Sequence, residues 1–504
     1  MPLARATLLL VTLAVALCVR LSSIGWGLPP VTPQVRASDF RSSYAFDEDD
    51  ILSAVAKAGV KHFDFDPHDY HWGTLHIELV LVALDGAEVV GLFPTPWREA
   101  YYNLRDGGFQ RVYTIGRLVS VATALLTVWL LFLFPSSWAG PFAAMLVAVS
   151  PTHLLQSDQV RVDVTMMAML TLTLLAALRI PGSAGAGGFL LLGIAGGLAI
   201  AGKYSAVTAV IAIFLATLCL QRFPWRGAAA LAGGALLGFC AGSPYVLIKP
   251  QAFWGAISKS ARVAASVPSD FTLPICKLLE LTAADVARFS IGLPAVLLAI
   301  VGIVFMLRRR APSDWIILAA TAGYAAILLP LRVPLIRYHV PLVALLGLCA
   351  GVALERFSPR WRSLLTIAAL AMPIGGSIAQ IHYMRAPHPA NLMLGRILEV
   401  VPPGTSIARL TREMPPLDEK VYPRGPNVLL ADLTLDPPAW VLTTDLPDVP
   451  YRSSTLALLQ SSYDQIAHFE SQRILAWATL GETPSVHDWK YTHPSFTLYR
   501  RRRP

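Results

Sequence analysis

The chain has 504 residues, of which 55% are hydrophobic and only 14% are charged, and its mean hydropathy is +0.54. Soluble proteins carry about 25% charged residues, so this composition excludes an ordinary soluble enzyme and predicts a membrane protein. The formal net charge of +9 is better explained by membrane topology and lipid contact than by nucleic-acid binding. The five cysteines show neither metal-ligand spacing nor a disulfide pattern.

Apolar runs of about 20 residues predict eleven membrane-spanning helices, and hence a mainly α, polytopic membrane helix bundle. The first run has no cleavage pattern before Pro29-Pro30 and more spans follow, so we interpret it as a retained helix rather than a signal peptide. The spans lie at about residues 7–28, 114–134, 138–155, 164–180, 187–201, 205–221, 227–247, 290–307, 315–331, 337–354 and 363–382.

Two stretches are too polar to span. Residues 29–112 form a long first outer loop, in which we expect amphipathic helices lying at the membrane interface. Residues 386–504 have an ordinary soluble composition and predict a small C-terminal α/β or α+β domain. The chain therefore divides into a transmembrane domain at 1–385 and a C-terminal domain at 386–504.

Lys and Arg in the short connections predict the orientation. The basic turns at residues 221–226, 308–310 and 356–362 fall on one side of the eleven-span arrangement, which we assign to the cytoplasm. The first outer loop, the 248–288 loop and the C-terminal domain then lie on the non-cytoplasmic side. We expect a multi-pass plasma membrane protein, as in the bacterial inner membrane.

A run of four acids, Asp47-Glu48-Asp49-Asp50, follows the first span by about 20 residues. Acids in such numbers lie at or beyond the bilayer surface. On one interpretation Asp47 is the N-cap of a helix, and the other acids favour its positive dipole end. On the other, it is a carboxylate at the mouth of a membrane enzyme that takes a proton from an acceptor hydroxyl or amine. Both can hold together.

A charged turn separates the third and fourth spans and faces the same side as the acidic run. It contains Asp158, Arg161 and Asp163. Charged residues among membrane spans are functional candidates because burying them is costly. The turn is either a mutually neutralised one or a second acidic group, with a cation, that lines the same cavity as Asp47.

Several other cations occupy breaks or ends of spans. Lys203 follows Gly202 between two short spans, where it can meet a phosphate as a point charge or reach to the interface. Arg337 and Tyr338 open the tenth span, where Arg is suited to bidentate phosphate contact or to interfacial anchoring. Arg117, near the outer end of the second span, is a weaker candidate of the same kind.

The first outer loop is rich in possible metal ligands. Because imidazole and carboxylate suit several metals, a divalent ion is conceivable, but the spacing matches no established zinc pattern. A groove shaped for substrate by His71 and its aromatic neighbours is the favoured alternative. No Gly-rich phosphate loop or Ser-His-Asp signature appears. The residues in question are His62, Asp64, Asp66, His68, His71 and His76, of which His68, His71 and His76 form a loose set.

Five short motifs occur in a characteristic order. The chain resembles the GT-C membrane glycosyltransferases, in particular the protein mannosyltransferase and aminoarabinose transferase group, glycosyltransferase family 39. The resemblance covers about residues 5–385. The motifs are the acidic pair Asp47-Glu48, the turn from Ser157 to Asp163, Gly202-Lys203-Tyr204, Gly242-Ser243-Pro244-Tyr245, and Arg337-Tyr338 followed by Pro341.

This resemblance implies a polyprenyl-phosphate sugar as donor, used on the non-cytoplasmic face. It implies Asp47 as general base with Glu48 beside it, Asp163 as a further acid, and Lys203 and Arg337 at the donor phosphate. The acceptor is a protein, a lipid or a glycan. The chain has His68-Asp69-Tyr70-His71-Trp72-Gly73 where aminoarabinose transferases carry Lys-Pro-Pro.

Two other functions remain possible. A polysaccharide ligase or polymerase would also use lipid-linked glycans. A lipid-linked sugar transporter would fit buried charges and broken helices, although the sequence shows no internal repeat.

Overall fold

The structure is a computed structural model. It describes residues 3–28, 43, 45, 47–58, 66–102, 107–180, 185–265, 274–328, 335–409, 421–422, 424–427, 437–445, 453–470, 474–479 and 494–502.

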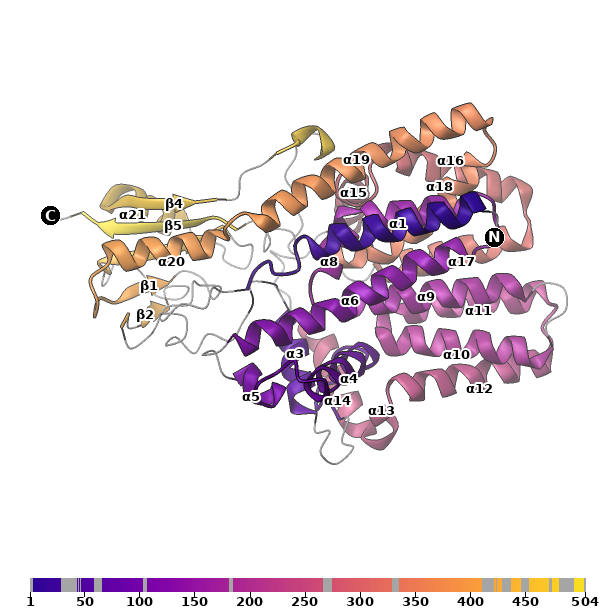
Figure 1. The fold of residues 1–504 in the computed structure, drawn as a ribbon, viewed down its shortest axis with the longest axis horizontal. Coiled ribbons are helices and arrows are strands. Elements are labelled where there is room, and N and C mark those ends of the chain that lie inside the picture. The colour runs from indigo at the N-terminus through magenta and orange to yellow at the C-terminus, as the bar shows by residue number, and fades with distance from the viewer. Residues whose placement is uncertain are drawn as a thin grey trace.

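A helix lies at each of the eleven predicted spans, and together these helices form the bundle in Figure 1. Within the described residues, five helices are long and apolar enough to cross a membrane, or six if one bent pair counts as a span. The bundle helices are α1 (Leu3–Leu21), α6 (Gly108–Phe132), α7 (Ala139–Val149), α9 (Val162–Arg179), α10 (Ala186–Gly202), α11 (Val207–Leu220), α12 (Trp225–Gly242), α16 (Leu293–Arg309), α17 (Pro312–Leu328), α18 (Val340–Leu354) and α19 (Pro359–Arg385).

Small residues bring neighbouring helices close together. A Cβ added to Gly193 of α10 would lie 2.2 Å from the carbonyl oxygen of Leu231 on α12, and one added to Gly234 would lie 2.2 Å from that of Leu190. Backbone contact of this kind is typical of membrane helices, because lipid offers no hydrophobic driving force for their association.

Short elements connect the bundle helices. Two of them place site residues, since they interrupt the chain just before a span. These are η2 (Tyr204–Ala206) before α11 and η6 (Ile336–His339) before α18. The others are α8 (Pro151–Ser157), α13 (Tyr245–Ile248), α14 (Pro250–Ala265), α15 (Ile275–Asp285) and the π-helical η4 (Val286–Ser290).

The predicted helices of the first outer loop are present as α3 (Glu48–Lys57), α4 (Leu75–Val89) and α5 (Trp97–Tyr102). They share a buried apolar cluster with the first turns of α6, which includes Ile51, Val80, Trp97 and Tyr113. This packing fixes the acidic run at the end of α6.

The C-terminal part is a mixed sheet with helices, as predicted. The strand order is β2-β1-β3-β5-β4, with β1 parallel to β2 and β3, and β5 antiparallel to β3 and β4. Figure 1 shows this sheet at one end of the bundle and the N-terminus at the other. Its elements are α20 (Pro389–Val400), β1 (Ile407–Arg409), β2 (Arg424–Asn427), β3 (Trp440–Thr444), α21 (Ser453–Ser462), β4 (Tyr463–Phe469), η7 (Ala476–Thr479) and β5 (Phe496–Arg501).

Candidate active site

Asp47 lies immediately before α3, with its backbone in the left-handed region at φ 62°. Asp47 is the N-cap residue of α3 and the other three acids lie in its first turn, as one interpretation predicted, but the Asp47 side chain makes no capping hydrogen bond. Instead Arg337 Nη1 donates to Asp47 Oδ2, and Arg161 Nη1 lies 3.5 Å from the same oxygen. The ion pairs therefore join the loop to the beginnings of two spans.

A second ion pair lies beside the first. Lys203 Nζ donates to Asp163 Oδ1 at 2.6 Å, and the two side chains are 12% and 3% exposed. Lys203 Nζ also lies 5.0 Å from the ring centre of Tyr338, and the Arg337 guanidinium lies 5.9 Å from the same centre. Tyr338 thus connects the two pairs into one charged group. We call the residues Asp47, Arg161, Asp163, Lys203, Arg337 and Tyr338 the charged cluster.

Close packing positions Lys203. A Cβ added to the preceding Gly202 would lie 3.0 Å from the Met166 backbone on α9, one turn beyond Asp163. One added to Gly73 in the outer loop would lie 2.0 Å from the carbonyl oxygen of Ala201. The end of α10 is therefore held between α9 and the loop, which keeps Lys203 next to Asp163.

Glu48 does not join the charged cluster, although it is adjacent to Asp47. It is completely buried and accepts from Arg117 Nε at 2.8 Å and Nη2 at 2.6 Å. It also accepts from the Val160 N–H at 2.9 Å, one residue before Arg161. Glu48 therefore joins the outer loop to Arg117 on α6 and to the turn between α8 and α9. Because Glu48 follows Asp47 and Val160 precedes Arg161, these bonds fix the backbone next to both partners of the Asp47–Arg161 contact.

Two other predicted residues make their hydrogen bonds outside the charged cluster. Asp158 is completely buried and accepts a hydrogen bond from Ser23 Oγ at the end of α1. His71 Nδ1 lies 2.5 Å from Asp69 Oδ1.

The remaining histidines do not converge. His68 pairs with Asp66 at 3.2 Å, and buried His76 bonds Thr165 Oγ1 at 2.8 Å. Nowhere in the described ranges do three His, Cys, Asp or Glu side chains lie together as a metal site. His62 and Asp64 lie outside the described residues.

The sequence analysis did not identify Arg20 or Gln159. Arg20 is completely buried within α1 and donates to the carbonyl oxygens of Ala148 and Val147 at 3.2 and 3.1 Å. A charge inside an apolar run was the available signal. Gln159 Oε1 accepts from Arg161 Nε and Nη2 at 3.0 and 2.8 Å, and nothing in its sequence context distinguishes it.

Burial alters the acidity of the loop. Burial raises the pKa of Asp49 to about 7, although hydrogen bonds from the Tyr113 hydroxyl and the Ser43 N–H act in the opposite direction. Burial, together with the charges of Asp47 and Asp69, also raises the pKa of Asp50. The Asp49 carboxyl can therefore take up a proton near neutral pH.

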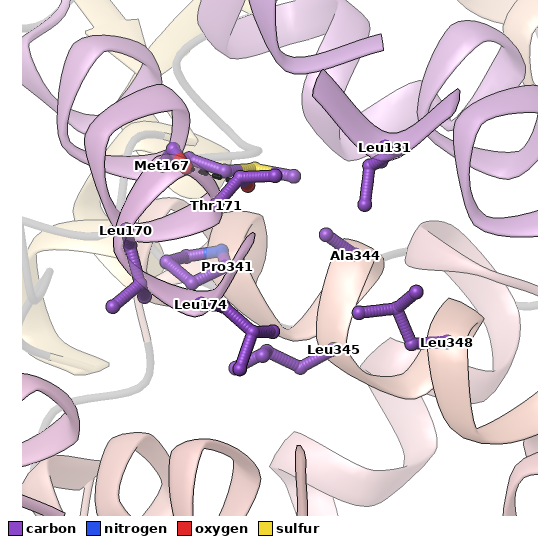
Figure 2. A pocket seen from close by; sticks show the side chains of 9 residues that line it. All are labelled: Leu131, Met167, Leu170, Thr171, Leu174, Pro341, Ala344, Leu345 and Leu348. Carbon is purple, nitrogen blue, oxygen red and sulfur yellow. Dashed lines mark hydrogen bonds between the residues drawn. The ribbon is translucent and has the colours of Figure 1, made fainter. Parts of the chain in front are cut away.

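A small apolar cavity lies between α6, α9 and α18, and its lining begins one turn along α9 and α18 from the charged cluster. Met167 follows Asp163 by one turn, and Pro341 follows Arg337 by one turn. Figure 2 shows side chains from α6, α9 and α18 around it, without a charged group among them. The lining residues are Leu131, Met167, Leu170, Thr171, Leu174, Pro341, Ala344, Leu345 and Leu348.

Part of the chain matches a family of the kind that the motifs resemble. Residues 102–248 match the model of the dolichyl-phosphate-mannose-protein mannosyltransferase family. The matched segment contains Arg161, Asp163 and Lys203, whereas Asp47 and Arg337 lie outside it. No curated protein sequence matches the chain.

Among solved structures, ArnT from Cupriavidus metallidurans bound to undecaprenyl phosphate is similar, at 15% identity and a TM-score of 0.45, over 97% of this chain and 97% of that one. The archaeal oligosaccharyltransferase AglB from Archaeoglobus fulgidus, in complex with an inhibitory peptide and a dolichol-phosphate, is similar at 11% identity and a TM-score of 0.49. That match covers 99% of this chain and 88% of the AglB chain.

Proposed function

We propose that this membrane protein is a glycosyltransferase that moves a sugar, a hexose or a pentose, from a polyprenyl-phosphate donor to a protein, lipid or glycan acceptor. The observation that carries the proposal is the charged cluster. It places acids suited to proton removal beside cations suited to a phosphate, and the side chains one turn further along α9 and α18 are apolar. The match of residues 102–248 to a mannosyltransferase family supports it.

In the proposed reaction Asp47 is the general base. The acceptor oxygen or nitrogen attacks the anomeric carbon as Asp47 takes its proton. The bond between that carbon and the phosphate oxygen breaks, and its electron pair leaves with the phosphate. A single displacement inverts the anomeric carbon. Asp163 holds Lys203 in place and is the second acid of the site.

Lys203 and Arg337 are the proposed phosphate ligands. Both are largely buried, and both lie at an interruption next to a bundle helix, which in the proposed arrangement is the membrane boundary where a lipid phosphate sits. Fixed positive charges in a site that excludes water stabilise the charge that develops on a leaving phosphate. The ring centre of Tyr338 lies 5.0 and 5.9 Å from the two cations.

The proposed orientation places the charged cluster and the C-terminal sheet on the non-cytoplasmic side. The turns at residues 221–226, 308–310 and 356–362 carry the arginines that favour the cytoplasm. The sheet lies at the end of the bundle opposite to the N-terminus (Figure 1).

The activity is tested by comparing the lipid-linked sugars of cells that carry the protein with those of cells that lack it. If the chain is a transferase, mass spectrometry will find one polyprenyl-phosphate sugar accumulating in the cells that lack it. The same sugar will disappear from one protein, lipid or glycan. Identical donor pools and identical glycans in both cell types would contradict the proposed function.

A further inference from the structure

Each proposed phosphate ligand already holds a carboxylate. Arg337 Nη1 donates to Asp47, with both side chains 15% exposed, and Lys203 Nζ donates to Asp163 at 2.6 Å. Ion pairs that are shielded from water are stronger than exposed ones. A phosphate that enters between Lys203 and Arg337 therefore competes with two carboxylates.

The contact with Arg337 also engages Asp47, the proposed general base. Asp47 Oδ2 accepts from Arg337 Nη1, and Arg161 Nη1 lies 3.5 Å away. While these contacts persist, this oxygen is committed to guanidinium groups rather than to an acceptor hydroxyl. Arg161 is itself held by Gln159, so it remains in place when Arg337 moves.

We propose that the donor phosphate activates the base by exchanging partners with it. The inference rests on the proposed function and deepens it. The phosphate takes Arg337 from Asp47 and Lys203 from Asp163, and Asp47 Oδ2, steadied by Arg161, becomes available to the acceptor. The enzyme therefore binds its lipid-linked donor before its acceptor. Without a donor, Asp47 stays paired with Arg337 and cannot take a proton from the acceptor.

The exchange must run in reverse when the product leaves. The donor is a phosphate diester with one negative charge, whereas the lipid phosphate left after transfer is a monoester with a charge of about −1.5 to −2 near neutral pH. The lipid phosphate product therefore holds Arg337 and Lys203 more tightly than the donor did. Asp47 can pair with Arg337 again only after it has lost the proton taken from the acceptor. The Asp47–Arg337 and Asp163–Lys203 pairs form again once the product has left.

Binding of undecaprenyl phosphate to the full chain in nanodiscs of uncharged lipid tests the exchange. If the ion pair is closed nine-tenths of the time, it weakens apparent affinity about tenfold. Asp47→Asn should therefore bind the lipid phosphate about tenfold more tightly than wild type, and Asp163→Asn should also bind it more tightly. Adding Arg337→Ala to Asp47→Asn should abolish the gain.

Asp50→Asn is the matched control, because it removes the same charge one turn along α3, and we expect its affinity to stay within about twofold of wild type. Equal or weaker binding by both Asp47→Asn and Asp163→Asn, or an equal gain in Asp50→Asn, would overturn the exchange alone. Failure of the wild type to bind undecaprenyl phosphate would overturn the proposed function as well.

Discussion

Asp47 adopts a backbone conformation that few residues other than glycine tolerate. Its φ of 62° costs about 1–2 kcal/mol for an ordinary side chain, somewhat less for Asp. The conformation directs the carboxylate toward Arg161 and Arg337 instead of the first turn of α3. At this residue, site geometry prevails over helix capping.

Asp47→Asn should lower transfer by at least about a hundredfold, because the amide cannot take a proton. The neutral amide accepts a hydrogen bond more weakly than the carboxylate and so releases Arg337 more readily, but the contact is partly exposed and the thermal unfolding midpoint should change little. A transfer assay and an unfolding curve on the same preparation measure both effects. Asp464→Asn in the sheet is the control that should keep wild-type activity, and near-full activity of Asp47→Asn would reject the assignment.

Glu48 should matter for stability rather than for chemistry. Removing one partner of a buried ion pair costs about 3–5 kcal/mol, since it leaves a buried charge unpaired. Glu48→Gln and Arg117→Met should each lower the unfolding free energy by that order, and the double variant should lose less than their sum. A fully stable but inactive Glu48→Gln would instead support the catalytic role expected from the sequence.

Asp49 should make stability depend on pH. Burial raises its folded pKa to about 7, so between about pH 4 and about pH 7 the folded state binds more protons than the unfolded state. The contribution of Asp49 to stability is therefore lost as pH rises through that window and is constant above it. The unfolding midpoint should decline less steeply with pH in Asp49→Asn, and parallel curves for the two proteins would contradict this.

At the scale of elements, the outer loop packs against the ends of α10 and α12. Gly73 packs on Ala201, and Thr74 Oγ1 donates to the Gly242 carbonyl at 3.0 Å. The loop therefore fixes the backbone at Lys203, where the helix is interrupted between α10 and η2.

Gly73→Ala should displace that loop, because its Cβ would lie 2.0 Å from a backbone oxygen. We expect at least about a tenfold loss of transfer, of the order that small misplacements of site groups produce. Gly86→Ala on α4, where a Cβ meets nothing within 4 Å, is the matched control and should stay active. Equal activity of the two variants would show that the loop does not position Lys203.

The helices were predictable from the sequence because each apolar run carries its own signal. The ion-pair partners of the charged residues were not predictable, since Asp47 and Arg337, which contact each other, are 290 positions apart in the sequence. The roles of adjacent Asp47 and Glu48 also separate only in three dimensions, where one faces the charged cluster and the other is buried against Arg117. The sequence indicated which residues were costly to bury and left their pairing open.

At the scale of the whole molecule, charge and apolar surface are arranged along one axis. Arginine-rich turns were predicted on the side of the N-terminus, and the sheet lies at the opposite end of the bundle (Figure 1). Within the charged cluster, Asp163 lies in the first turn of α9 and Arg337 lies just before α18, and the lining of the small apolar cavity begins one turn further along both helices. A lipid phosphate at this boundary can meet its cations while its tail remains in apolar surroundings.

The affinity of the purified protein for undecaprenyl phosphate, with and without its two proposed phosphate ligands, tests this account most directly. Charged hydrogen bonds contribute about 1.5–3 kcal/mol each, so Lys203→Ala combined with Arg337→Ala should weaken binding more than about a hundredfold. Lys277→Ala, which removes an exposed lysine paired with Glu280, should leave it unchanged. Wild-type affinity in the double variant would contradict the account.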